Sequence, residues 1–485
     1  MSAQDKQKRL PSYAVLDEDG VQRYARLTDQ GVYNLTASEL FWRDRQPYLD
    51  QHGYLLRPRY APNWEPSWKG TSLDPMFCED SIMPFNHQVI DARRKSDGKL
   101  VAIKMFPNNS QESHIALLLS SINDSQNRCI PVYEVLRDPY QPQTSLMVMP
   151  YLRPCNDPDF VTVGDIIEFV GQTLEGLVFL HRQRIAHRDV AIENIMMDGS
   201  PLYPGGHHPV RTEYTPDALY EVKPLPRAER SIKYYYIDFG LSSLIPEGSS
   251  PYVLGRAGRD KEVPELSSTV PYDAFKVDIY ALGNMYYHDF EQKYNSTQFL
   301  VPLLERMRQQ RPEARPTAAE LLLQWEAIRA DLAPSLYRWR LGPKTEPTFE
   351  RMLRYTCVGI FGSRMSGWYV YHSNDGLYIT VSLFPDEALL AQSRTLATLI
   401  HSNVVRKRPV CNELEDAALR TVPGSVPGYA LGGCFDAVVP SVLSYALFGL
   451  VEYCRIILMY IIEKALCFGR SRIRFMYLSP SLTFA

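Results

Sequence analysis

Four polar residues have types and an order along the chain that could support chemistry: Lys104, Asp189, Asn194 and Asp238. Lys104 follows the apolar residues 101–103, so its ammonium group would act as a point charge on a rigid strand. Asp189 follows a stretch with helical periodicity and can accept a proton. Asn194 and Asp238 offer the hard oxygen ligands that Mg²⁺ requires. Each residue alone is more often a surface or turn residue, so the interpretation depends on their combination.

The combination forms three short motifs in a fixed order. They are Val101-Ala102-Ile103-Lys104, then His187-Arg188-Asp189 with Asn194 five residues further on, then Asp238-Phe239-Gly240. Together these motifs resemble the signature of eukaryotic-type protein kinases. The resemblance implies that Lys104 holds the phosphates of ATP, that Asp189 acts on the substrate hydroxyl, and that Asn194 and Asp238 bind the metal. It therefore predicts ATP and Mg²⁺ as the cofactors.

Further positions of the kinase pattern are occupied, and the resemblance assigns them roles. Glu112 is the expected partner of Lys104, and the alternative is a surface glutamate on an amphipathic helix. The ATP-binding site is expected to include Lys104, Glu112, Val89, Ala102, Met149, Pro150, Leu152 and Met196, with Met149 as gatekeeper. Structural or regulatory roles are expected for His187, Arg188, Phe239, Gly240, Glu265, Asp278 and Arg315. Arg188 would bind a phosphorylated serine after Asp238, or those serines are ordinary loop residues.

An α+β, bilobal protein-kinase-like fold would position these residues, with a small β-rich lobe, a larger helical lobe and extensions at both ends. We expect strands at 100–104, 146–149 and 234–237 and an amphipathic helix at 164–183. The predicted domains are an N-terminal extension at 1–74, a kinase domain at 75–340 and a C-terminal extension at 341–485. Within the domain we expect the small lobe at 75–150, the large lobe at 151–340 and an inserted loop at about 201–233.

Two features depart from the kinase pattern. The three glycine positions of the phosphate-binding loop hold Ile82, Pro84 and His87. Glycine lets the backbone approach phosphates closely, so we expect low ATP affinity or turnover. Ala191 stands where serine/threonine kinases usually carry a lysine that contacts the transferred phosphate, whereas Glu193 follows the serine/threonine pattern.

Three functions remain open from the sequence. The first is an ATP-dependent protein kinase that phosphorylates a protein hydroxyl, with serine/threonine specificity favoured. The second is a pseudokinase or scaffold that binds partners with little catalysis. The third is a small-molecule phosphotransferase, against which the Glu265 and Arg315 motifs count. More narrowly, segments such as 233–240 and 271–278 resemble uncharacterised protein kinases of basidiomycete fungi.

Composition limits the partners and the location. With 52 basic and 55 acidic residues the formal net charge is −3, which argues against nucleic acid as a partner. The eight cysteines form no zinc-type cluster, and residues 1–12 lack the apolar core of a signal peptide, so we expect a cytoplasmic protein. His207 and His208 are interpreted as part of a solvated loop, with a metal site as the alternative. The protein substrate and the oligomeric state cannot be read from these patterns.

An apolar segment at 437–462 near the C-terminus leaves three alternatives. It contains Glu452 and Arg455, and charges in a membrane-spanning helix are costly. The segment is therefore a membrane anchor, an amphipathic helix packed on the protein, or a poorly folded tail. Membrane association through this segment stays a prediction.

Overall fold

The computed structural model describes residues 11–84, 87–108 and 110–347, together with the backbone of three later strands. The chain divides into two compact units, residues 1–347 and 348–485. Within the second unit, β13 (Gly367–Ser373) pairs antiparallel with β14 (Gly376–Ser382), which pairs parallel with β15 (Ile473–Phe475). The apolar segment at 437–462 lies outside the described residues. Among the residues that are described, no helix has the length and apolar character needed to cross a bilayer.

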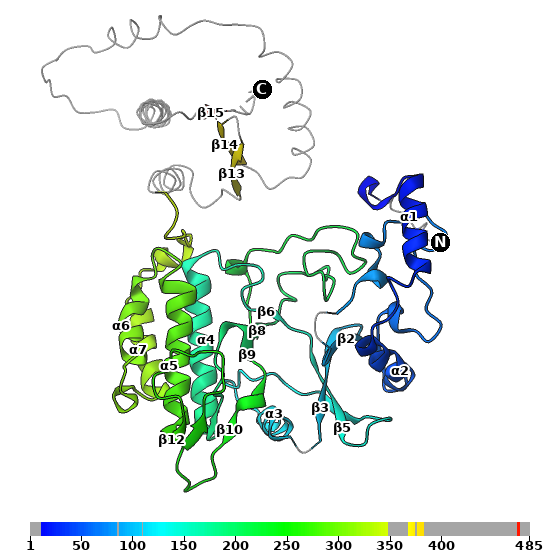
Figure 1. Ribbon diagram of the computed structural model, residues 1–485. Helices are drawn as coiled ribbons and strands as arrows, with labels where there is room; N and C mark the ends of the chain where they lie inside the picture. The colour runs from blue at the N-terminus through cyan, green and yellow to red at the C-terminus, as the bar shows by residue number, and fades with distance from the viewer. Residues whose placement is uncertain are drawn as a thin grey trace, which may run out of the picture. The chain divides into compact units, whose positions relative to one another are not determined.

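The first unit has two lobes, as Figure 1 shows, with β2, β3 and β5 on one side and α4, α5, α6 and α7 on the other. The predicted α+β bilobal fold is confirmed. The helices are α1 (Glu18–Asp29), α2 (Ala37–Gln51), α3 (Gln111–Ser121), α4 (Val163–Arg182), α5 (Ala274–Tyr286), α6 (Val301–Met307) and α7 (Ala318–Asp331). The strands are β1 (Tyr54–Leu55), β2 (Val89–Arg94), β3 (Leu100–Pro107), β4 (Glu134–Arg137), β5 (Thr144–Pro150), β6 (Arg153–Pro154), β7 (Ile185–Ala186), β8 (Ile195–Met197), β9 (Tyr234–Tyr236), β10 (Ser243–Leu244), β11 (Tyr252–Gly255) and β12 (Ser267–Asp273).

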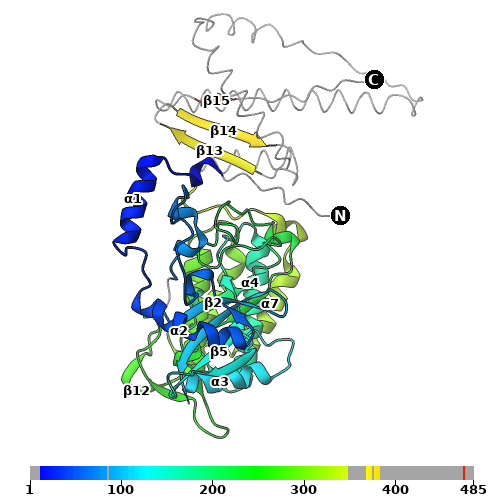
Figure 2. The same ribbon diagram turned by 90° about the vertical axis from the view of Figure 1, so that its right-hand side faces the viewer.

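The small lobe is an antiparallel sheet with the order β1-β2-β3-β5-β4. Because side chains alternate between the faces of a strand, Val101 and Ile103 of β3 point to one face and Lys104 to the other. Val101 and Ile103 are fully buried in a cluster with Trp42 and Leu49 of α2, so α2 covers the outer face of the sheet. Figure 2 shows α2 against this sheet. Lys104 is left on the inner face, toward the large lobe.

The structure differs from the predicted boundary at residue 74. β1 pairs with β2, and Tyr54 of β1 is buried in the same cluster as Trp42 of α2. Thr36 and Glu39 form a capping box at the start of α2, and the Trp42 indole N–H donates to the carbonyl oxygen of His87 at 3.2 Å. Part of the predicted N-terminal extension therefore completes the small lobe.

The core of the large lobe surrounds α4. Its residues Ile166, Val170, Leu174 and Leu177 are fully buried, as the helical periodicity predicts. Thr162 caps α4, which packs against α7 and β9. A second sheet of order β6-β8-β9 lies beside it, and its β9 is the strand predicted at 234–237.

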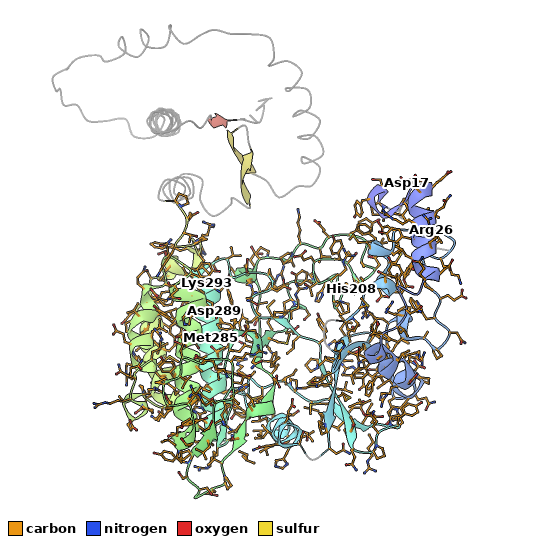
Figure 3. All side chains as sticks on the ribbon, in the orientation of Figure 1. Asp17, Arg26, His208, Met285, Asp289 and Lys293 are labelled. Carbon is orange, nitrogen blue, oxygen red and sulfur yellow. The ribbon has the colours of Figure 1, made fainter. Side chains whose placement is uncertain are left out.

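The insertion, residues 201–233, joins β8 to β9. It is a loop, as predicted, but it has buried residues of its own, including Leu202, Ala218 and Ile232. The interpretation of His207 and His208 as solvated is wrong, because their residue exposures are 6% and 0%. Figure 3 shows His208 on the side of the unit that carries the elements before β2, across the molecule from Met285 of α5.

Candidate active site

Lys104 lies at the centre of a charged cluster between the lobes. Its Nζ donates a hydrogen bond to Glu112 Oε1 and a second, at 3.3 Å, to Asp238 Oδ1. Glu112 stands in the first turn of α3, which is capped by Ser110. Burial lowers the pKa of Lys104, but the carboxylates of Glu112 and Asp238 outweigh that effect, so the pKa is raised. Lys104 is therefore positively charged, and the carboxylates of Glu112 and Asp238 fix the position of its ammonium group.

Residues 187–194, which we call the catalytic loop after their expected role, place Asp189 and Asn194 together. Asn194 is buried, and its Nδ2 donates to Asp189 Oδ2 and to the Asp189 carbonyl oxygen, both at 2.8 Å. The amide is thereby oriented, with Oδ1 as its remaining acceptor atom. The other carboxylate oxygen of Asp189, Oδ1, accepts a hydrogen bond from the backbone N–H of Arg259 at 2.6 Å.

Asp278 of α5 fixes the catalytic loop by accepting hydrogen bonds from its backbone. Its side chain is completely buried and accepts hydrogen bonds from the backbone N–H groups of His187 at 2.8 Å and Arg188 at 2.7 Å. It also contacts His181 Nε2 at 2.9 Å. Because both backbone N–H groups donate to this one buried carboxylate, Asp278 sets the position of the loop.

Asp238 and Asn194 come together because their strands are antiparallel neighbours. Asn194 immediately precedes β8, Asp238 follows β9 by two residues, and the Ile237 N–H donates to the Asn194 carbonyl oxygen at 3.0 Å. Asp238 has a φ of +61°, a left-handed conformation that is uncommon outside glycine and frequent at functional sites. Phe239 after it is buried against His187, with ring centroids 5.4 Å apart.

This pair fits Mg²⁺ by donor type. Mg²⁺ is usually bound in proteins by one or two carboxylates together with substrate phosphates, and Asp238 and Asn194 offer one carboxylate and one amide oxygen. Within the described ranges, no group of three or more His, Cys, Asp or Glu side chains is placed to hold a metal ion. His207 and His208 are used inside the insertion, where His207 Nδ1 contacts the His208 carbonyl oxygen at 3.0 Å.

The residues predicted to contact ATP lie on both sides of this cluster. Val89 is the partner of Lys104 in the β2–β3 ladder, and Ala102 is the partner of Met149 in the β3–β5 ladder. All four side chains therefore lie on the inner face of the sheet. Pro150 ends β5, Leu152 follows it and is buried, and Met196 lies in β8 of the large lobe.

The remaining predicted residues belong to the segment that follows Gly240 or contact it. Arg315 is buried and forms a two-pronged ion pair with Glu265, at 2.5 and 2.9 Å. Arg188 donates to Ser243 Oγ and to the Leu254 carbonyl oxygen, both at 3.0 Å. The sequence-predicted catalytic, metal and structural residues are thus brought into one continuous region.

A lysine–glutamate pair, a loop aspartate and an Asn–Asp metal pair define the class of site used for phosphoryl transfer. Residues 86–294 match the family model of the protein kinase domain. These residues are therefore similar to a eukaryotic-type protein kinase domain, and the match supports phosphotransfer as their general function. A comparison with curated proteins found no similar sequence. The resemblance to fungal kinases stays a prediction.

Sequence reasoning missed how the phosphate side of the site is built. The three glycine positions are counted back from Val89 and Ala92 of β2, but the strand paired with β2 on this side, β1, already ends at Leu55. We call residues 56–84 the connector. It contains short 3-10 helices, and its Ile82 is buried, with a carbonyl oxygen that accepts from Arg57 Nη1 at 2.7 Å.

The connector is held by buried charges and by the insertion. The Arg57 guanidinium lies 3.2 Å from Asp91 of β2 and 3.6 Å from Glu79. His208 of the insertion approaches the same Glu79 at 3.5 Å, and Arg211 donates to the carbonyl oxygen of Met76. The insertion and the connector are far apart in sequence. The turn-rich composition of the insertion predicts a loop, but no local sequence pattern predicts its contact with the connector.

Proposed function

We propose that the chain is an active, Mg²⁺-dependent protein kinase that transfers the γ-phosphoryl group of ATP to a protein hydroxyl. The observation that supports this most directly is the position of Lys104, which contacts Glu112 and Asp238 at once. A kinase needs both the lysine–glutamate pair and the metal-binding aspartate in place. A pseudokinase would be under no requirement to keep this arrangement.

The residues have distinct tasks in the proposed reaction. The oxygen of the substrate hydroxyl forms a bond to the γ-phosphorus, and the bond from that phosphorus to the bridging oxygen breaks, with its electron pair leaving on ADP. The hydroxyl proton passes to the Asp189 carboxylate, while Lys104 holds the α- and β-phosphates. When bound, Mg²⁺ supplies positive charge at the β- and γ-phosphates, and Asn194 and Asp238 are the residues that would hold it.

We further propose serine and threonine as the acceptors. Glu193 follows the pattern of serine/threonine kinases, since tyrosine kinases with alanine at the position of Ala191 carry arginine at that of Glu193. Peptide libraries with serine, threonine or tyrosine as the sole hydroxyl would separate these possibilities. Faster transfer to tyrosine than to serine or threonine would contradict the proposal.

The proposed activity is tested by incubating the full chain with labelled ATP, Mg²⁺ and a peptide library. Asp189→Asn should lower transfer by at least about 100-fold, because general acid–base groups typically contribute that much or more. Asp331→Asn, an exposed aspartate at the end of α7, is the matched control and should leave transfer unchanged. Equal transfer by the wild type and Asp189→Asn would reject the proposal.

A pseudokinase is the second candidate, and a specific observation favours it. The three expected glycine positions hold Ile82, Pro84 and His87, and Ala191 removes a cation from the catalytic loop. Thermal unfolding with Mg-ATP distinguishes the two, since a ligand at 100 times its Kd stabilises a protein by about 2.7 kcal/mol. Stabilisation by Mg-ATP without phosphoryl transfer would identify an ATP-binding scaffold. The absence of both stabilisation and transfer would identify a scaffold that does not use ATP.

A further inference from the structure

The catalytic loop lacks a positive charge where the transferred phosphoryl group would lie. Ala191, two residues after Asp189, has no side chain that can reach a phosphate. Charge on the γ-phosphoryl oxygens must nevertheless be stabilised during transfer, and arginine or lysine is the usual source of that stabilisation. The segment that ends at Glu265 places Arg259 beside the catalytic loop.

Gly258 and Arg259 lie directly against the catalytic loop. Gly258 has a φ of +106°, and a Cβ atom there would lie 2.8 Å from the Arg188 carbonyl oxygen. Glycine is therefore required for the segment to approach the loop so closely. The approach allows the next residue, Arg259, to donate its backbone N–H to Asp189 Oδ1 at 2.6 Å.

The Arg259 side chain reaches the other oxygen of the same carboxylate. Its Nε lies 3.9 Å from Asp189 Oδ2, and 54% of the side chain is exposed, against 12% for Asp189. An ion pair of this length and exposure is weak, so the guanidinium can move to a stronger anion. The acids that follow it are engaged elsewhere, since Asp260 and Glu262 both accept hydrogen bonds from Asn284 Nδ2.

We propose that Arg259 supplies the cation that the catalytic loop lacks at Ala191. In this role its guanidinium leaves Asp189 when Mg-ATP binds and donates to the γ-phosphoryl oxygens, for which its planar fork is well suited. Asp189 is then free to accept the substrate proton, while the Arg259 backbone N–H still orients it. The proposal rests on the proposed kinase activity.

Arg259→Ala tests this role because it removes the guanidinium and leaves the backbone hydrogen bond to Asp189. We expect kcat for peptide phosphorylation to fall about 100-fold, the usual effect of removing one donor to a developing oxyanion. Arg259→Gln, which keeps the length but not the charge, should show a similar loss. Arg256→Ala, an exposed arginine three residues earlier, is the control and should leave kcat unchanged.

A compensating substitution separates a phosphate-binding role from a structural one. Ala191→Lys in the Arg259→Ala background should restore kcat at least about tenfold, because it returns the cation from the catalytic loop. A full rate in both Arg259 variants, or no recovery with Ala191→Lys, would overturn the proposal for Arg259 and leave the kinase activity standing. A wild-type chain without any transfer would overturn both.

Discussion

The catalytic loop and the connector border the same candidate site but are held in different ways. Asp189 and Asn194 are fixed by short hydrogen bonds inside the large lobe and by the buried carboxylate of Asp278. The connector is fixed by a buried arginine, Arg57, and by contacts from the insertion. The first region depends on particular functional groups at particular atoms, whereas the second depends on packing and charge balance, which many sequences can satisfy.

Removing the anchor of the catalytic loop should have the largest effect. Asp278→Ala leaves the N–H groups of His187 and Arg188 without their acceptor, at about 1–3 kcal/mol each, so the free energy of unfolding should fall by about 2–6 kcal/mol. Transfer should be lost as well. Urea denaturation measures the first effect and labelled ATP the second.

Asp273→Ala is a matched control for that change on the same helix. Asp273 caps α5 by accepting from the Phe275 N–H at 2.9 Å, and loss of a cap costs about 1 kcal/mol. If both variants lost the same stability and kept transfer, the catalytic loop would not depend on Asp278.

Breaking the charge cluster of the connector should destabilise the protein nearly as much as Asp278→Ala does. It should leave phosphoryl transfer in place. Arg57→Met keeps most of the side-chain volume and leaves the buried carboxylate of Asp91 unpaired, which we expect to cost about 3 kcal/mol. Adding Asp91→Asn should recover part of that stability. Complete loss of transfer in folded Arg57→Met, measured at saturating ATP, would show that the two regions are not separate.

Detaching the insertion should have a smaller effect. Arg211→Ala removes the hydrogen bond to the Met76 carbonyl oxygen, at a cost of about 1 kcal/mol in the free energy of unfolding. Limited proteolysis should then cut the insertion faster. Arg230→Ala, an exposed arginine near the end of the insertion, should change neither quantity. Equal behaviour of the two variants would mean that the Arg211 contact does not hold the connector.

The smallest expected effect is a pH dependence that originates in the insertion. Burial lowers the pKa of His207 from 6.5 to about 4. Between these values the unfolded chain binds a proton that the folded chain does not, so stability should fall as the pH falls from about 6.5 to 4. His207→Asn, which can keep the hydrogen bond to the His208 carbonyl oxygen, should lose less stability over this range. Parallel melting-temperature curves for the two proteins would contradict the assignment.

The same contrast explains what could be predicted from the sequence. Lys104, Asp189, Asn194 and Asp238 were found because their chemistry fixes residue type and spacing, and the periodicity of 164–183 predicted α4. The pairing of β1 with the small-lobe sheet was not predicted because β1 is only two residues long and its partners, Arg93 and Arg94, lie 38 and 40 positions after Leu55 and Tyr54. A contact of that separation leaves no local pattern.

The position of Arg259 was missed for a related reason. Arg259 lies beside Asp189 because the backbone conformation of Gly258 lets the segment approach the catalytic loop closely. The absence of a lysine at Ala191 was visible in the sequence, but the replacement lies 68 residues away in the chain. A fold was needed to place the two side by side.

The insertion adds a further attachment between the two lobes. The chain crosses between them once near Tyr151, and the contacts of His208 and Arg211 with the connector join them again. Tyr151 itself donates to the Pro209 carbonyl oxygen at 2.7 Å, so both attachments are mechanically coupled. Opening of the site must therefore break or stretch the contacts of the insertion as well as bend the chain near Tyr151.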